Sequence, residues 1–114
     1  TVEDGQSTGH LLLPEHPEMT AVCCHDDLMA GGFLDTCRQR GMVIPRDLSV
    51  TGFGNVPLSR LITPTLTTME IPRFQMGKMV TEMLFTKMEN PERFRRRSVE
   101  CKLIVRESTA RHTD

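Results

Sequence analysis

The sequence predicts an α/β domain built on a three-layer parallel sheet, and two observations carry this prediction. Helix-like and strand-like segments alternate along the chain with short connections, which is the order that produces a parallel sheet with helices on its faces. The run Thr20–Cys24 is apolar, rich in strand formers and free of polar alternation, as expected of a strand covered on both faces. The length of 114 residues is that of one domain.

Composition limits the classes of protein that fit. Fifteen acidic and 14 basic residues give a formal net charge of −1, whereas a chain built mainly to hold nucleic acid has a clear basic excess. There is no apolar run long enough for a membrane span and no signal-peptide pattern at the start. Four irregularly spaced cysteines are too few for a disulfide scaffold. We therefore expect reduced thiols in a cytoplasmic protein.

The first element expected is a short helix at about 2–13. Thr1 and Asp4 have the spacing of a capping box, which favours a helix start. Two glycines inside the segment weaken the prediction, and Pro14 and Pro17 are expected to end the helix.

A second helix is expected after the strand at Thr20–Cys24. Asp26 or Asp27 caps it, and Gly41 is the expected C-terminal stop. Apolar residues recur inside it with the 3–4 spacing of a buried helix face. These residues are Ala30, Phe33, Leu34 and Cys37.

The rest of the chain continues the alternation. The expected segments are a strand at 48–53, a mixed segment at 58–64, a strand at 66–69, a helix at 72–89, a strand at 99–105 and a tail at 107–114. Five of the eight methionines lie between Met69 and Met88 and cover more than one face of the long helix. That helix is therefore expected to contact two neighbours.

Several stretches, taken in order and spacing, resemble a known family. They are Thr20–Gly32, Gly41–Phe53, "PTLTT" at 64–68, Met76-Gly77 and "LIVREST" at 103–109. The ordered set resembles the C-terminal part of bacterial transcriptional regulators of the lactose/galactose repressor (LacI/GalR) family, and the resemblance covers nearly the whole chain.

The resemblance implies a type I periplasmic-binding-protein-like fold, in which two α/β subdomains are joined by three crossings and an effector binds in the cleft. In the family an N-terminal helix-turn-helix headpiece binds operator DNA as a homodimer. The chain looks like a fragment without that headpiece and without most of the N-terminal subdomain. By analogy, residues 1–69 form the core of the C-terminal subdomain. Residues 70–92 form a crossover and a helix of the N-terminal subdomain, and 93–114 a return strand and tail.

The resemblance also places candidate effector-binding residues beyond the carboxyl ends of the strands, where ligands bind in open α/β sheets. Asp26 matches a family position that faces the effector, and Asp27 is expected to cap the helix. Gly54 replaces the family aspartate that binds ligand hydroxyls. Either the effector is not a typical sugar, or Asp26 or Asn55 substitutes, or sensing is degraded. Arg73 matches a position near the cleft and meets an anionic or hydroxyl group there, unless it is simply solvated.

The same resemblance implies a two-fold dimer surface formed by the helix after the first strand and the segment before "LTT". The matching residues are Gly31, Leu34, Asp35, Arg38, Leu58, Leu61 and Ile62. Clustered aliphatics in a loop-like segment independently suggest an interface, although a loop tucked onto its own core explains them as well.

Other chemistry finds little support. The cysteines and histidines match no zinc-ligand spacing, no nucleophile elbow is present, and no dinucleotide fingerprint exists. We therefore expect no metal, no cofactor and no enzyme activity, and we read the basic segment 93–97 as a solvated loop. The leading hypothesis is the effector-sensing and dimerising region of a repressor that binds a sugar-like molecule. The alternative is a fragment of a periplasmic sugar-binding protein of a transporter.

Overall fold

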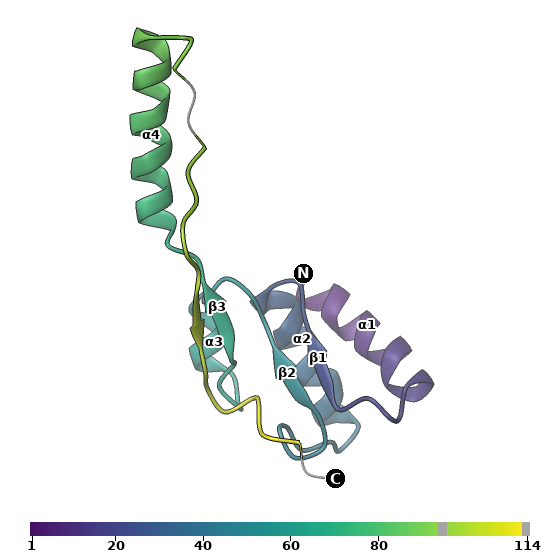
Figure 1. Ribbon diagram of the computed structural model, residues 1–114. Coiled ribbons are helices and arrows are strands. Elements are labelled where there is room, and N and C mark those ends of the chain that lie inside the picture. The colour runs from purple at the N-terminus through teal and green to yellow at the C-terminus, as the bar shows by residue number, and fades with distance from the viewer. Residues whose placement is uncertain (94–95, 113–114) are drawn as a thin grey trace. The chain divides into compact units, whose positions relative to one another are not determined.

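The computed structural model describes residues 1–93 and 96–112 of the chain (Figure 1). Helices and strands alternate as the sequence predicts. The elements are α1 (Val2–Glu15), β1 (Ala21–Cys23), α2 (Asp27–Gln39), β2 (Ser49–Thr51), α3 (Leu58–Leu61), β3 (Thr68–Glu70), α4 (Arg73–Glu89) and β4 (Lys102–Ile104). Helix α3 was expected only as a mixed segment.

The chain divides into two compact units. The first contains residues 1–70 and 103–114, and the second contains residues 71–102. The first unit holds α1, α2, α3 and the strands up to β3, and the second holds α4.

Helix α1 begins with the predicted capping box. The Thr1 hydroxyl accepts a hydrogen bond from the Asp4 backbone N–H at 3.1 Å, and Asp4 accepts one from the Thr1 amino group at 2.8 Å. The helix ends at Glu15, between Pro14 and Pro17, so it runs two residues past the expected end and takes in Pro14. Proline lacks the N–H that would bond the carbonyl four residues earlier. That carbonyl, on His10, instead accepts a hydrogen bond from the Arg40 guanidinium at 3.4 Å.

Helices α1 and α2 approach each other closely through glycines. A Cβ added to Gly5 would lie 2.0 Å from the Met29 carbonyl oxygen, and one added to Gly32 would lie 1.9 Å from the Val2 carbonyl oxygen. The glycine in α1 that weakened the helix prediction is therefore a contact point between two helices.

The strands of the first unit form a parallel arrangement. Strands β1 and β2 pair in parallel, with Val22 opposite Val50. A parallel bridge joins Thr51 to Thr67 on the other side of β2, and β3 pairs with β4. The predicted α/β class with parallel strands is confirmed.

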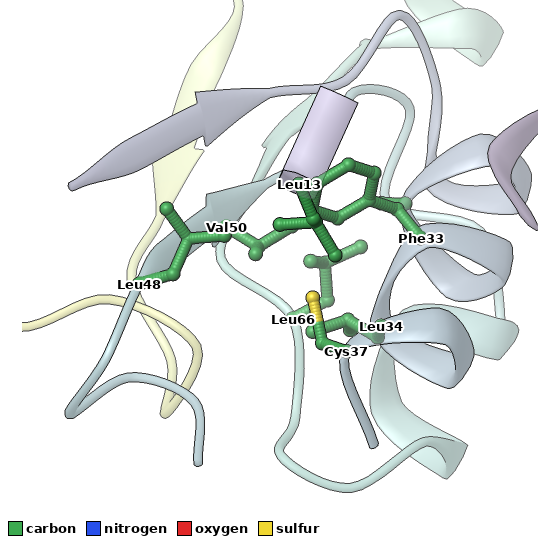
Figure 2. Packing of buried hydrophobic residues seen from close by; sticks show 8 residues of the cluster. Leu13, Phe33, Leu34, Cys37, Leu48, Val50 and Leu66 are labelled. Carbon is green, nitrogen blue, oxygen red and sulfur yellow. The ribbon is translucent and has the colours of Figure 1, made fainter. Parts of the chain in front are cut away.

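The hydrophobic core lies between α1, α2 and one face of this sheet. Leu48 and Val50 stand two residues apart and so point to the same face. Figure 2 shows apolar side chains from both helices and from the sheet pointing toward one another. The buried members are Leu13, Ala30, Phe33, Leu34, Cys37, Leu48, Val50 and Leu66. The predicted apolar face of α2 is confirmed.

Strand β1 does not have the double cover that its sequence predicts. Ala21 and Cys23 are exposed, while Val22 between them packs against the core. Successive side chains of a strand point to opposite faces, so the helices of the described chain cover only one face of β1. The expectation of a strand covered on both faces is wrong for these residues, because the described part of the chain supplies no second helical layer over Ala21 and Cys23.

The described residues of the expected tail form no strand, but hydrogen bonds attach the tail to the sheet, chiefly through Ser108. The Ser108 backbone N–H donates to the Thr65 carbonyl at 3.0 Å, and its carbonyl accepts from the Val50 N–H at 2.8 Å. Its hydroxyl donates to the Val50 carbonyl at 2.6 Å and accepts from the Thr67 N–H at 2.8 Å. Ser108 is fully buried. The "LTT" and "VREST" segments are therefore structural partners.

The second unit consists of α4 and the segment that follows it. None of the α4 side chains is buried, and Phe74 is 89% exposed. The two-neighbour packing that the methionine pattern predicts is therefore not made by the described residues of this unit. None of the helices in the described ranges is long and apolar enough to cross a membrane.

Candidate functional site

Two loops leave the carboxyl ends of the parallel strands β1 and β2 and meet in the first unit. The first leads into α2, and the second spans residues 52–57. The backbone N–H of Asp27 donates to the Phe53 carbonyl at 3.2 Å and joins them. This edge of an open parallel sheet is the place where ligands bind in α/β folds.

The two aspartates do not divide their roles as the family resemblance implied. Asp26 is the helix N-cap, since its Oδ1 accepts the Met29 backbone N–H at 2.7 Å. The assignment of the cap to Asp27 is wrong. The other carboxylate oxygen of Asp26, Oδ2, makes no hydrogen bond to any described residue, and the side chain is half-buried. Asp26 can therefore cap the helix with one oxygen and present the other to a ligand.

Asp27 is fully buried, and its carboxylate joins the loop after β2 to strand β3. Its Oδ2 accepts the Val56 backbone N–H at 2.7 Å, and its Oδ1 accepts the Thr68 hydroxyl at 2.5 Å. A Cβ at Gly52 would lie 2.4 Å from the same Oδ1, so glycine is needed there. Sequence reasoning missed this role, because the partners come from 29 and 41 residues away.

Gly54 is buried, and the backbone conformation at this position suits glycine. Its φ is +122°, a conformation that side-chain-bearing residues rarely adopt. Its N–H donates to the Met69 carbonyl at 2.8 Å. The position that matches the family's ligand-binding aspartate thus contributes backbone only, in a conformation that disfavours an aspartate.

Asn55 has both polar side-chain atoms occupied. Its Oδ1 accepts from Arg106 Nη2 at 2.7 Å. Its Nδ2 donates to Glu70 Oε1 at 3.0 Å. Its φ of +48° lies in the left-handed region, which asparagine tolerates better than most residues. The fourth candidate, Arg73, is exposed and is the first residue of α4, in the second unit.

The apolar dimer candidates are divided between core and surface. Leu34 is 6% exposed and belongs to the core, and Ile62 packs against it. Leu58 lies over Gly31, with Cδ2 3.1 Å from the position of an added Cβ. Leu61 is 78% exposed. Among these residues Leu61 offers the largest apolar surface.

The charged dimer candidates pair with each other. Arg38 Nη2 lies 2.6 Å from Asp35 Oδ1, and Gln6 Nε2 donates to Asp35 Oδ2 at 3.0 Å. The hydrogen bond from Arg38, followed by that from Gln6, holds the pKa of the Asp35 carboxyl below its usual value. Asp35 thus also ties α1 to α2.

The thiols differ in environment. Cys23 is exposed, whereas burial raises the pKa of Cys24 to about 12 and that of Cys37 to about 11. All four cysteines are free. Over residues 1–93 and 96–112, no group of three His, Cys, Asp or Glu side chains is placed to hold a metal ion.

A hollow of about 380 Å³ lies in the second unit and contains none of the predicted site residues. It is lined by α4 side chains from Val80 to Lys87 together with Arg93 and Arg97. Arg93, Arg96 and Arg97 of the basic segment are exposed, and Arg97 lies 3.7 Å from Glu82. Phe94 and Arg95 of that segment lie outside the described residues.

The parallel strands and the polar loops at their carboxyl ends define an α/β domain of the class in which ligands bind at this edge of the sheet. The chain matches the family described as "Periplasmic binding protein-like domain" over residues 2–109. It belongs to this family. The resemblance to LacI/GalR regulators is confirmed by the relatives below.

Curated relatives of this chain are transcriptional repressors. The repressor CytR of Escherichia coli K12 is 36% identical over 110 residues, covering 96% of this chain and 32% of the relative. The ribose operon repressor of Haemophilus influenzae is 36% identical over 98 residues, covering 85% of this chain and 30% of the relative. The repressor PurR of Serratia proteamaculans is 36% identical over 109 residues, covering 95% of this chain and 32% of the relative. The chain thus spans about one third of the length of these relatives.

Solved structures of LacI family regulators share the fold. One from Arthrobacter sp. FB24, in complex with lactose, has a TM-score of 0.81 at 29% identity and is matched over 96% of this chain and 42% of its own. One from Enterococcus faecium, with bound ribose, has a TM-score of 0.84 at 27% identity, over 96% of this chain and 41% of its own. The regulator CelR, in complex with cellobiose, has a TM-score of 0.86 at 28% identity, over 95% of this chain and 33% of its own.

Proposed function

We propose that this chain is part of the effector-sensing and dimerising region of a LacI-type transcriptional repressor. It binds a small, hydroxylated, sugar-like molecule at the carboxyl edge of the β1–β2 sheet and thereby controls operator binding by a helix-turn-helix headpiece. The whole protein acts as a cytoplasmic homodimer and is not an enzyme. The observation that carries the proposal is the match of residues 2–109 to the family, with the polar loops placed at the ligand edge.

The site supports a particular way of binding the effector. Gly54 supplies no carboxylate, so the hydroxyl-binding acid falls to Asp26, whose Oδ2 is free of hydrogen bonds to described residues. A carboxylate oxygen accepts charge-assisted hydrogen bonds from hydroxyl groups.

Two functions raised by the sequence can be compared. The curated relatives described above are transcriptional repressors. The matched structures are transcriptional regulators in complex with lactose, ribose or cellobiose. These findings favour the repressor over a transporter's sugar-binding protein.

The experiment is a chimera in which residues 2–109 replace the matching third of Escherichia coli CytR. Binding of the chimera to the host's own operator is measured by fluorescence anisotropy in the presence of monosaccharides, disaccharides, sugar acids and polyols. We expect at least one compound to change operator affinity, because effectors act by preferring one conformation. A dimeric, operator-binding chimera that responds to none of them would overturn the proposal.

A matched variant tests the role of Asp26. Asp26→Asn keeps an oxygen for the Met29 N–H and therefore keeps the cap, but it removes the charge offered to the ligand. We expect the active compound to bind about tenfold more weakly, since a charge-assisted hydrogen bond contributes about 1.5–3 kcal/mol. The control Asp47→Asn alters an exposed carboxylate that bonds Arg46 and should leave effector affinity unchanged.

A further inference from the structure

We infer that Asn55 is a positioning residue that fastens the loop after β2 to the two points where the chain leaves and re-enters the first unit. We call the three residues Asn55, Glu70 and Arg106, with the hydrogen bonds between them, the Asn55 latch. The inference rests on the proposed function for its purpose, since the loop it fastens is the one at the proposed effector edge. The contacts themselves are independent of any effector.

The side-chain amide of Asn55 makes the hydrogen bonds that hold the latch together. Asn55 Oδ1 accepts from Arg106 Nη2 at 2.7 Å, and Asn55 Nδ2 donates to Glu70 Oε1 at 3.0 Å. The hydroxyl of Ser59 lies 3.3 Å from the same Oδ1, but its single proton is directed to the Val56 carbonyl at 2.7 Å. An amide offers an acceptor and a donor on one planar group. Asparagine can therefore bridge a cation and an anion that lie on opposite sides of it.

Both charged partners stand at the crossings between the units. Glu70 is the last residue of the first unit before the chain passes to residue 71, and the chain returns at Leu103, three residues before Arg106. Asn55 directly follows Gly54, whose N–H is bonded to the Met69 carbonyl at 2.8 Å. A displacement of the loop is thus transmitted to the outgoing and the returning strand through short polar contacts.

Arg106 is itself held firmly. Its Nη1 donates to the Leu66 carbonyl at 2.8 Å and to the Ser59 hydroxyl at 3.1 Å, and its backbone N–H donates to the Thr67 hydroxyl at 2.9 Å. These hydrogen bonds fix the position of the guanidinium, and the guanidinium in turn fixes the position of the loop through Asn55. Its multiple donors in a planar fork suit this role, which a lysine cannot reproduce.

These contacts change the role expected of Asn55. Because the amide oxygen and the amide nitrogen are both engaged, Asn55 acts on a ligand through the position of the Gly54 backbone and of Asp27, whose carboxylate holds the Val56 N–H. The structure assigns it the coupling of the loop to the two crossings, in place of direct ligand contact.

The test inverts the hydrogen-bond polarity between Asn55 and Glu70. In Asn55→Asp the group that donated to Glu70 becomes a second carboxylate facing it, so at pH 7 the contact turns from attractive to repulsive. Adding Glu70→Gln restores one donor and one acceptor in reversed order. Asn90→Asp, at the exposed end of α4, is the matched control for the same side-chain change outside the latch.

Amide hydrogen exchange of the 114-residue chain, followed by NMR at pH 7, is the readout. We expect Asn55→Asp to accelerate exchange at Gly54 and Val56 at least tenfold beyond any change at the core amide of Val50, because local opening is separable from global unfolding. Adding Glu70→Gln should reverse most of that acceleration, and Asn90→Asp should change none of these amides. Unchanged exchange in Asn55→Asp, or no recovery on adding Glu70→Gln, would overturn the latch.

The CytR chimera separates this inference from the proposed function. If the unaltered chimera ignores every compound, the proposed function fails, while the exchange measurement still decides the latch by itself. If the unaltered chimera responds, Asn55→Asp should reduce the effector-induced change in operator affinity, and adding Glu70→Gln should restore it. An undiminished response in Asn55→Asp would show that the loop does not act through the latch.

Discussion

Replacing Gly32 by alanine is the sharpest test of how the two helices of the first unit pack. A Cβ at Gly32 would lie 1.9 Å from the Val2 carbonyl oxygen, whereas ordinary contact begins at 3.4 Å. The obstacle is backbone, so no side-chain rotation relieves it. The helices would have to separate by about 1.5 Å at this point, and the nearby contacts of Gly5 with Met29 would be lost with it.

Two opposing effects set the magnitude. Alanine is favoured over glycine inside a helix by about 1 kcal/mol. Overpacking costs about 1–3 kcal/mol, and the cost is at the upper end or beyond where rigid backbone must move. We expect Gly32→Ala to lower the free energy of unfolding by about 2 kcal/mol or more, a large part of the roughly 5–15 kcal/mol typical of a domain.

Urea unfolding followed by circular dichroism measures the effect, with a neighbouring glycine as the matched control. Gly31→Ala in the same helix would meet only the tip of Leu58, at 3.1 Å, which a small side-chain movement relieves. Gly31→Ala should therefore be close to neutral. Equal stability of Gly32→Ala and the unaltered chain would refute the close helix approach.

Four further outcomes are expected. Native iodoacetamide labelling followed by mass spectrometry should modify exposed Cys23 and spare Cys37, whose burial raises its pKa to about 11; equal labelling of both would contradict the packing. Hydrogen bonds from Thr65, the backbone N–H first, lower the pKa of Glu107 below 4.5, so its contribution to stability is present above pH 4.5 and lost as pH falls through the lowered value. Glu107→Gln should flatten the acid side of the melting-temperature profile, and an unaltered profile would exclude the contact. Sedimentation should show self-association that Leu61→Glu weakens, whereas a strictly monomeric unaltered chain at high concentration would count against the dimer surface. Calorimetry on the 114-residue chain alone should show no micromolar sugar binding, and such binding would mean that the described edge is a complete site.

Some features could be predicted because they depend on neighbours in sequence. The capping box at Thr1, the buried face of α2 and the glycine stop at Gly41 all follow from local spacing. The structure confirms them, with Gly41 at a φ of +74° after the end of α2. The alternation of helices and strands likewise predicts the parallel arrangement.

The candidate site was predictable in place but not in detail. The carboxyl edge of the strands follows from the fold class, whereas the roles of Asp26 and Asp27 do not. Either residue has the chemistry of a helix cap, and the choice depends on Thr68 and Val56, which reach Asp27 from far along the chain. The engagement of Asn55 by Arg106, 51 residues away, is hidden for the same reason.

The sequence by itself determined the α/β class, the family and the position of most elements, because periodicity, caps and turn residues act within a few residues of one another. Only the tertiary structure decided that Gly5 and Gly32 let two helices approach closely. It also decided that Ser108 hydrogen-bonds to both Val50 and Thr67, and that the Asn55 amide hydrogen-bonds to Arg106 and Glu70. These contacts form between residues distant in sequence, and close approach, burial and hydrogen-bond geometry exist only once the chain has brought them together.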